Sequence, residues 1–135
     1  MKKIILLIIV IAAAVGFYLW WSNNKSTSPK TSIPVTPSMA LITYTDLGYT
    51  PASLSVKAGE MVVFKNESSN NIWPASANHP THNDYPTTGG CLGSTFDACK
   101  SVPPGQAWSF KFEVVGSWKY HDHLNPKYFG SITVE

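Results

Sequence analysis

Residues 108–134 read WSFKFEVVGSWKYHDHLNPKYFGSITV, and this stretch decides the fold class. Apolar and polar residues alternate at its start, which is the pattern of a β-strand with one buried face. A glycine then opens a second segment of this kind at 118–120, and a third follows at 131–134. The first of these strands is predicted to bury Trp108, Phe110, Phe112 and Val114.

The rest of the globular part has the same character. A turn at 57–60 places Gly59 where the backbone needs an unusual angle, and the proline-rich residues 74–107 are predicted to be loops. Runs of β-branched and aromatic residues indicate further strands at 40–45, 54–56, 61–65 and 72–73. About seven short strands punctuated by glycine and proline predict an all-β fold, a β-sandwich with Greek-key connections.

The order of these pieces resembles the cupredoxin family. Residues 56–66, VKAGEMVVFKN, are similar to the family's V-x-x-G-D-x-V-x-F-x-N hairpin. Pro104-Gly105 with Phe110, then the segment 116–120, and finally Gly130-x-Ile-x-Val resemble its later motifs in the right order. The resemblance covers residues 41–134. It implies a cupredoxin-like sandwich with a metal site at one end.

The copper-site motifs of that family are changed in this chain. A blue copper centre needs a cysteine thiolate and two imidazoles. By count from Gly116, the cysteine position holds Asp122, the upstream histidine position falls near Asn71, and no methionine stands before Gly130. The ordinary blue copper centre therefore cannot be built, and the chain resembles a variant with His-Pro-Thr-His and Tyr-His-Asp-His motifs.

All four histidines fall in two short clusters, 79–82 and 121–123. Side chains alternate along a strand, so His121 and His123 are expected on one side with Cα atoms roughly 6–7 Å apart. Loops that gather at one end of a sandwich would bring the other pair towards them. We predict a metal site, with copper favoured and zinc open, whose ligands are His82, His121 and His123, with His79 as a fourth.

Two carboxylates are less certain members of this site. Asp84 and Asp122 are candidates either to ligate the metal or to orient a ring nitrogen from outside the ligand set. Tyr85 and Tyr120 are candidates for a hydrogen-bonding or redox neighbour, although core packing is the expectation for Tyr120. The competing interpretation makes the histidines ordinary strand-end and surface residues.

The N-terminal residues 1–24 are predicted to be a single transmembrane anchor. Residues 4–21 form an apolar run without a charge, which is long enough to span a bilayer and ends at two tryptophans suited to the interface. Lys2 and Lys3 predict a cytoplasmic N-terminus. A cleaved signal peptide, cut near the alanines at 12–14, is the alternative. Residues 25–38 are predicted to be a Pro/Ser/Thr-rich tether, and residues 39–135 a domain outside the cytoplasm, in the periplasm or its equivalent.

Charge and cysteine content narrow the function classes. Residues 39–135 carry six lysines against eight acidic residues, a net charge of −2, and no basic aromatic patch, so nucleic-acid binding is not expected. Outside the cytoplasm, Cys91 and Cys99 are predicted to form a disulfide, with thiolate ligation of a metal as the alternative.

Three functions follow from these features. The first is a membrane-tethered copper-binding domain, in copper handling or electron transfer, with a redox or copper-delivery protein as partner. The second is a small copper or zinc enzyme, which nothing in the sequence requires. The third is a metal-free interaction module at the cell surface, because a fold can host unrelated functions.

Overall fold

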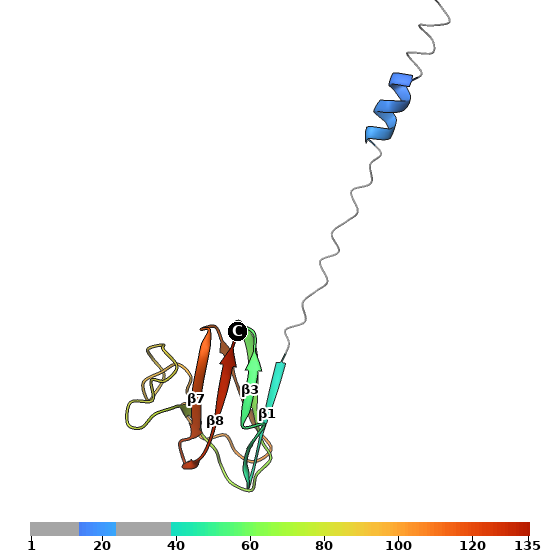
Figure 1. Cartoon of the computed structure of the whole chain (residues 1–135). Helices are drawn as coiled ribbons and strands as arrows, with labels where there is room; N and C mark the ends of the chain where they lie inside the picture. Colours follow the sequence, from blue (N-terminus) through green and yellow to red (C-terminus); the bar gives the residue numbers. More distant parts are fainter. Residues whose placement is uncertain (1–13, 24–38) are drawn as a thin grey trace, which may run out of the picture. The chain divides into compact units, whose positions relative to one another are not determined.

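The computed structural model describes residues 14–23 and 39–135. They fall into two separate parts, a helix at 14–23 and a β domain (Figure 1). Within these two ranges, no helix is long and apolar enough to cross a membrane. Most of the predicted anchor (residues 1–13 and 24) and the whole predicted tether (25–38) lie outside the described residues.

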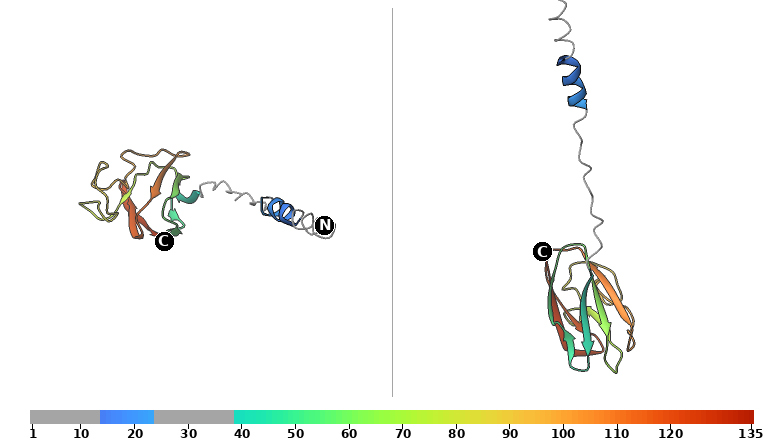
Figure 2. Two further views of the ribbon diagram at one scale, coloured as in Figure 1. Left: turned by 90° about the horizontal axis from the view of Figure 1, so that it is seen from above. Right: turned by 90° about the vertical axis from the view of Figure 1, so that its right-hand side faces the viewer.

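The β domain is a sandwich of two four-stranded sheets, which confirms the predicted all-β sandwich (Figures 1 and 2). The first sheet has the order β2-β1-β4-β6 and the second the order β3-β8-β7-β5. The strands are β1 (Met39–Thr45), β2 (Gly48–Thr50), β3 (Ser53–Val56), β4 (Glu60–Asn66), β5 (Pro74–Ser76), β6 (Ala107–Phe112), β7 (Gly116–Asp122) and β8 (Asn125–Val134).

The pairing crosses between distant parts of the chain. β1 runs parallel to β4, and β3 runs parallel to β8, whereas the other strand pairs are antiparallel. The predicted turn at Gly59 is present, and its φ of 88° lies in the region that glycine adopts without steric cost. Gly130 is needed for a different reason. A Cβ there would lie 2.3 Å from the Ala52 carbonyl oxygen and 2.4 Å from the Tyr120 hydroxyl.

The core lies between the two sheets and is rich in aromatic rings. Its largest fully buried side chains include Phe64, Phe112, Tyr120 and Ile132, one from each of β4, β6, β7 and β8. Phe96 is equally buried, although it comes from the long connection between β5 and β6. That connection, residues 77–106, is therefore part of the packed domain.

Three details differ from the sequence prediction. β2 was not expected, and β5 begins at Pro74, directly after the predicted strand at 72–73. Pro74 is tolerated because β5 is an edge strand, where a missing N–H breaks no ladder. The alternation at 108–114 buries Phe112 fully, but three neighbours stay partly exposed because β6 is also an edge strand: Trp108, Phe110 and Val114.

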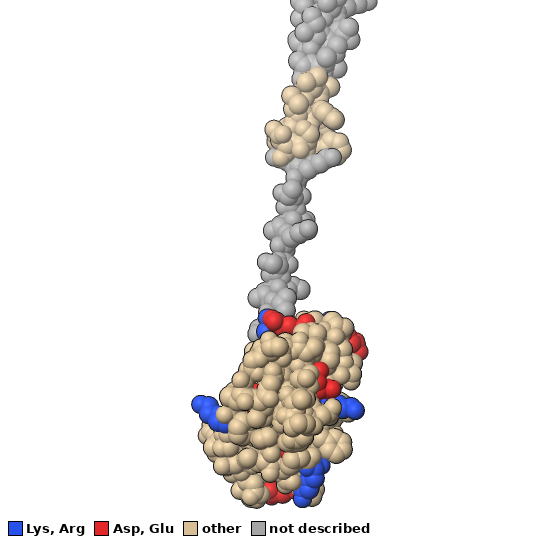
Figure 3. All heavy atoms as spheres, turned by 90° about the vertical axis from the view of Figure 1, so that its left-hand side faces the viewer, with Lys and Arg blue, Asp and Glu red and all other residues tan. Residues whose placement is uncertain are grey.

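The charged side chains of the domain are spread over its surface. In Figure 3, lysines and acidic residues form a few small groups, some of them with both signs, on a mostly uncharged face. One ion pair joins described residues, Lys111 and Glu113 at 2.8 Å, and both partners are exposed.

Candidate metal centre

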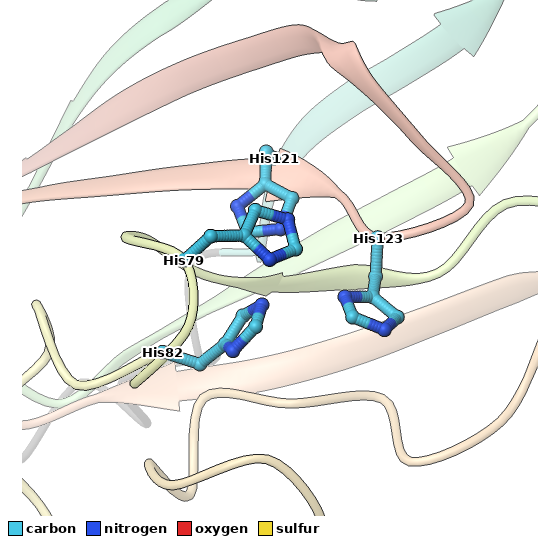
Figure 4. Close-up of side chains that lie close together, drawn as sticks. All are labelled: His79, His82, His121 and His123. Carbon is cyan, nitrogen blue, oxygen red and sulfur yellow. The ribbon is translucent and has the colours of Figure 1, made fainter.

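The four histidines of the chain meet at one place. His79 and His82 come from the connection after β5, while His121 is the penultimate residue of β7 and His123 follows that strand (Figure 4). One ring nitrogen from each lies within 4.8 Å of the others. The ring centroids of His79 lie 4.4 Å from His82, 4.7 Å from His121 and 5.4 Å from His123. The two sequence clusters therefore converge in space.

The end of β7 positions one pair of rings. His121 is paired with Ala75 of β5 and Phe129 of β8, so strands on both sides fix its backbone. The register shifts between His121 and Asp122, and this irregularity changes the direction in which the following side chains point. The backbone N–H of His123 then donates to the Trp73 carbonyl at 2.8 Å. These contacts place both imidazoles over the same side of the sheet end.

A closed loop positions the other pair. The Asp84 N–H donates to the Ala77 carbonyl at 2.6 Å, and the His82 N–H donates to the Asn78 carbonyl at 2.7 Å. His82 has a φ of 48°, a left-handed conformation that costs a non-glycine residue about 1–2 kcal/mol. Residues in such conformations persist where the surroundings impose them, and they cluster at functional sites.

The loop that carries His82 packs against the cysteine loop, which is residues 91–99 between Cys91 and Cys99. Gly93 packs so closely that a Cβ on it would lie 2.1 Å from the Thr81 carbonyl oxygen. Its φ of 150° also lies in the range that glycine favours. Gly93 therefore permits a contact that no other residue could make.

Three ring nitrogens of this cluster are buried without a hydrogen-bond partner. They are Nε2 of His82, Nε2 of His121 and Nδ1 of His123. The other nitrogen of His82, Nδ1, lies 3.1 Å from the Pro80 carbonyl, which selects the tautomer that leaves Nε2 with a free lone pair. A buried polar atom without a partner costs about 1–3 kcal/mol, so three at one point need a reason.

Burial also keeps the imidazoles of His82 and His121 neutral. Loss of solvent, followed by the nearby rings of His79, His82 and His123, lowers the pKa of His121 to about 4. Burial likewise lowers the pKa of His82, against a smaller opposing effect of its bond to Pro80. Because a metal competes with protons for the imidazole lone pair, lowered pKa values keep the ligands available to a metal at neutral and mildly acidic pH.

The two predicted carboxylates lie beside the cluster and hold its backbone. Asp84 Oδ2 accepts the Lys119 N–H at 2.6 Å, which ties the histidine loop to β7. Asp122 is 1% exposed. Its Oδ1 accepts the N–H groups of Trp73 at 2.8 Å and Leu124 at 3.1 Å, and its Oδ2 accepts the Tyr44 hydroxyl at 3.1 Å. Neither carboxylate contributes an atom to the ligand group around the four histidines.

Two neighbours of the cluster gave no signal in the sequence. Trp73 packs edge-on against His123, with ring centroids 5.1 Å apart, and its Nε1–H donates to Asp97 at 2.7 Å. Asp97 also accepts the backbone N–H groups of three residues of the cysteine loop: Cys91, Leu92 and Cys99. A tryptophan and an aspartate 24 residues apart show no local pattern that would reveal this contact.

The cysteines and tyrosines take structural roles. Cys91 and Cys99 form the predicted disulfide, with Cα atoms 5.3 Å apart, so neither sulfur is free to ligate a metal. Tyr85 is 2% exposed, and its hydroxyl accepts the N–H groups of Glu113 and Val114. Tyr120 is fully buried in the aromatic core. Core packing accounts for both rings.

The four imidazoles fit a single metal ion. Metal–nitrogen bonds of about 2.0–2.1 Å place nitrogens on opposite sides of an ion about 4 Å apart. The observed separation of up to 4.8 Å needs only a small closure of the loop onto the strand end. A bound ion would also give each of the three buried nitrogens the partner that it lacks.

No family model matches the sequence, and no curated protein matches it. Solved structures match its fold. The purple cupredoxin from Nitrosopumilus maritimus has a TM-score of 0.59 and 20% identity, over 71% of this chain and 99% of that chain. A Cu(I) form of an amicyanin variant has a TM-score of 0.58 and 21% identity, over 76% and 87% of the two chains. A second Cu(I) amicyanin variant has a TM-score of 0.56 and 21% identity, over 72% and 82%. Residues 39–135 therefore have the cupredoxin fold.

Proposed function

We propose that this chain is a copper-binding protein that holds one copper ion with its four histidines. One observation carries the proposal. Three buried ring nitrogens from two distant segments, on His82, His121 and His123, point at one site without any partner of their own. Without a bound ion, each of these buried nitrogens would destabilise the folded domain by about 1–3 kcal/mol.

The donor set favours copper among the common metals. Imidazole is a good ligand for copper, zinc, nickel and iron, and divalent copper binds a given nitrogen site most tightly of the first-row series. The fold supports the same choice, because three of the matching amicyanin structures are Cu(I) forms. Bound copper would supply a one-electron Cu(II)/Cu(I) couple.

The absence of a thiolate ligand separates copper handling from rapid electron transfer. Blue copper sites owe their electron-transfer properties to a copper–thiolate bond. In this chain both cysteines are joined to each other, and the position expected for the ligand holds Asp122, whose oxygens are occupied. We therefore assign the site to holding and passing on copper, with a copper-delivery or copper-accepting protein as the partner.

We propose further that residues 4–21 anchor the chain in the cell membrane, with the domain outside the cytoplasm. The apolar run and the two lysines before it support this. The Cys91–Cys99 disulfide agrees with an oxidising compartment. Extraction of cell membranes at alkaline pH tests the anchor: retention of the full-length chain supports it, and release into the soluble fraction overturns it.

Metal content of the full-length chain, purified in detergent, tests the copper proposal. The chain is stripped with a chelator, loaded with Cu(II), or with Zn(II) in parallel, and desalted. We expect one copper per chain, and none in a His121→Ala/His123→Ala variant with an unchanged β-sheet circular dichroism spectrum. Glu113→Ala removes an exposed carboxylate and is the control for adventitious binding. A wild-type chain without stoichiometric copper, or a double variant that keeps it, would overturn the proposal.

A further inference from the structure

We propose that His79 is the exchangeable ligand of this centre, whose place a nitrogen donor from outside takes when copper enters or leaves. The inference rests on the proposed copper site and concerns which of its four ligands leaves the copper ion first. His82 and His121 are 4% and 5% exposed, and the free nitrogen of His123 is buried, whereas the His79 side chain is exposed.

Burial makes the three other ligands hard to detach. If a bond from copper to His82, His121 or His123 breaks, a buried nitrogen is left without a partner, at a cost of about 1–3 kcal/mol. His79 carries no such penalty, because its ring turns directly into water. Copper therefore dissociates first from His79, and the other three nitrogens hold it while that position is open.

The open position can be reached from outside. A pocket of about 300 Å³ lies on the side of the cluster where His79 and His121 are found, and Pro126, Phe129 and Lys119 also line it. Phe129 is 69% exposed at its rim. His82 and His123 do not line this pocket, and of the two histidines that do, His121 is buried and only His79 is exposed, so a donor that approaches through it meets the His79 position first.

The division of the ligands suits handover of copper. An incoming imidazole, such as a histidine side chain of an accepting protein, can replace His79 while three nitrogens still bind the ion. Exchange then proceeds one ligand at a time, and copper is never released free into solution. The chemistry required of the partner is a single exposed nitrogen donor that fits beside Phe129.

Imidazole is the probe for this exchange. Copper-loaded full-length wild type, His79→Ala and His82→Ala are compared by metal content, electron paramagnetic resonance and the rate of copper loss to a chelator. We expect His79→Ala to keep one copper per chain and to lose it to the chelator about tenfold faster. This ratio of rates is equivalent to about 1.4 kcal/mol in the activation free energy of copper loss. Added imidazole should restore the wild-type spectrum and rate. His82→Ala should lose copper, and imidazole should not rescue it, because that position is closed to solvent.

The outcomes separate this inference from the function on which it rests. A wild-type chain that binds no copper overturns both. A copper-binding wild type whose His79→Ala variant loses all copper, or is not rescued by imidazole, overturns the exchange role alone. A folding defect in His82→Ala leaves a test in the wild type, because imidazole labelled with nitrogen-15 should replace the ring of His79 and so change the nitrogen hyperfine pattern of the copper spectrum. An unchanged spectrum contradicts the inference.

Discussion

Asp122 is expected to control both the stability of the domain and the position of His123. Its side chain is 1% exposed and accepts three hydrogen bonds, from the Trp73 N–H, the Leu124 N–H and the Tyr44 hydroxyl. Truncation to alanine leaves three donors without an acceptor. Each orphaned buried group costs about 1–3 kcal/mol, but water can reach the exposed Leu124, so the two other donors give an expected total loss of about 2–6 kcal/mol.

The same substitution should weaken copper binding without touching a ligand. The Trp73 N–H is held by Asp122, and the Trp73 carbonyl in turn accepts the His123 N–H at 2.8 Å. Release of Trp73 therefore frees the backbone that carries His123. Asp122→Asn preserves the shape and one accepting oxygen for both backbone donors, so it should cost only about 1–2 kcal/mol.

Urea unfolding of the metal-free chain, followed by copper titration calorimetry, measures both effects. Glu113→Ala, which removes a carboxylate from the exposed surface, is the matched control and should behave as wild type. The reasoning is refuted if Asp122→Ala unfolds at the same urea concentration as the control. It is also refuted if Asp122→Asn is as damaging as alanine, because the loss would then follow from charge alone and not from unpaired donors.

Three further predictions concern pH, the packing of the loops and the disulfide. Because the pKa of His121 is about 4 when folded and about 6.5 when unfolded, the free energy of unfolding of the metal-free domain should fall by about 3 kcal/mol as pH falls from 6.5 to 4, and urea melts of His121→Gln should show a smaller fall over the same range. Gly93→Ala should push the histidine loop away and weaken copper binding in a calorimetric titration, whereas Gly105→Ala, which also has a positive φ but open space around it, should not. Replacement of Cys91 and Cys99 by serine should cost about 2–3 kcal/mol in a urea melt, yet the nitrogen pattern of the copper spectrum should remain, since neither sulfur is a ligand; its loss would contradict this ligand set.

Local sequence patterns predicted those strands in which apolar and polar residues alternate clearly. β4 and β8 follow clear alternation. The strand expected at 61–65 is β4, which extends one residue further at each end. The strand expected at 131–134 is β8, which ends at Val134 as expected but begins earlier, at Asn125. β2 has only three residues and β5 begins with proline, so neither contains enough of the pattern to be recognised. Their places are set by partners far along the chain, β1 and β7.

The four histidines that converge could be predicted from the sequence, but the contacts that support them could not. His121 and His123 were paired by the period of a strand, and His79 and His82 by their closeness in sequence. Several of the contacts that hold them join residues 24 to 78 positions apart, such as Trp73 with Asp97 and Tyr44 with Asp122. Such contacts depend on the folded topology, and no local spacing encodes them.

The electron paramagnetic resonance spectrum of the copper-loaded full-length chain tests the central claim most directly. A four-histidine centre predicts one Cu(II) signal with hyperfine structure from nitrogen ligands, together with weak visible absorption. The signal should be lost in the His121→Ala/His123→Ala variant. An intense visible band of a copper–thiolate bond, or a copper signal without nitrogen hyperfine structure that survives in the double variant, would contradict the account.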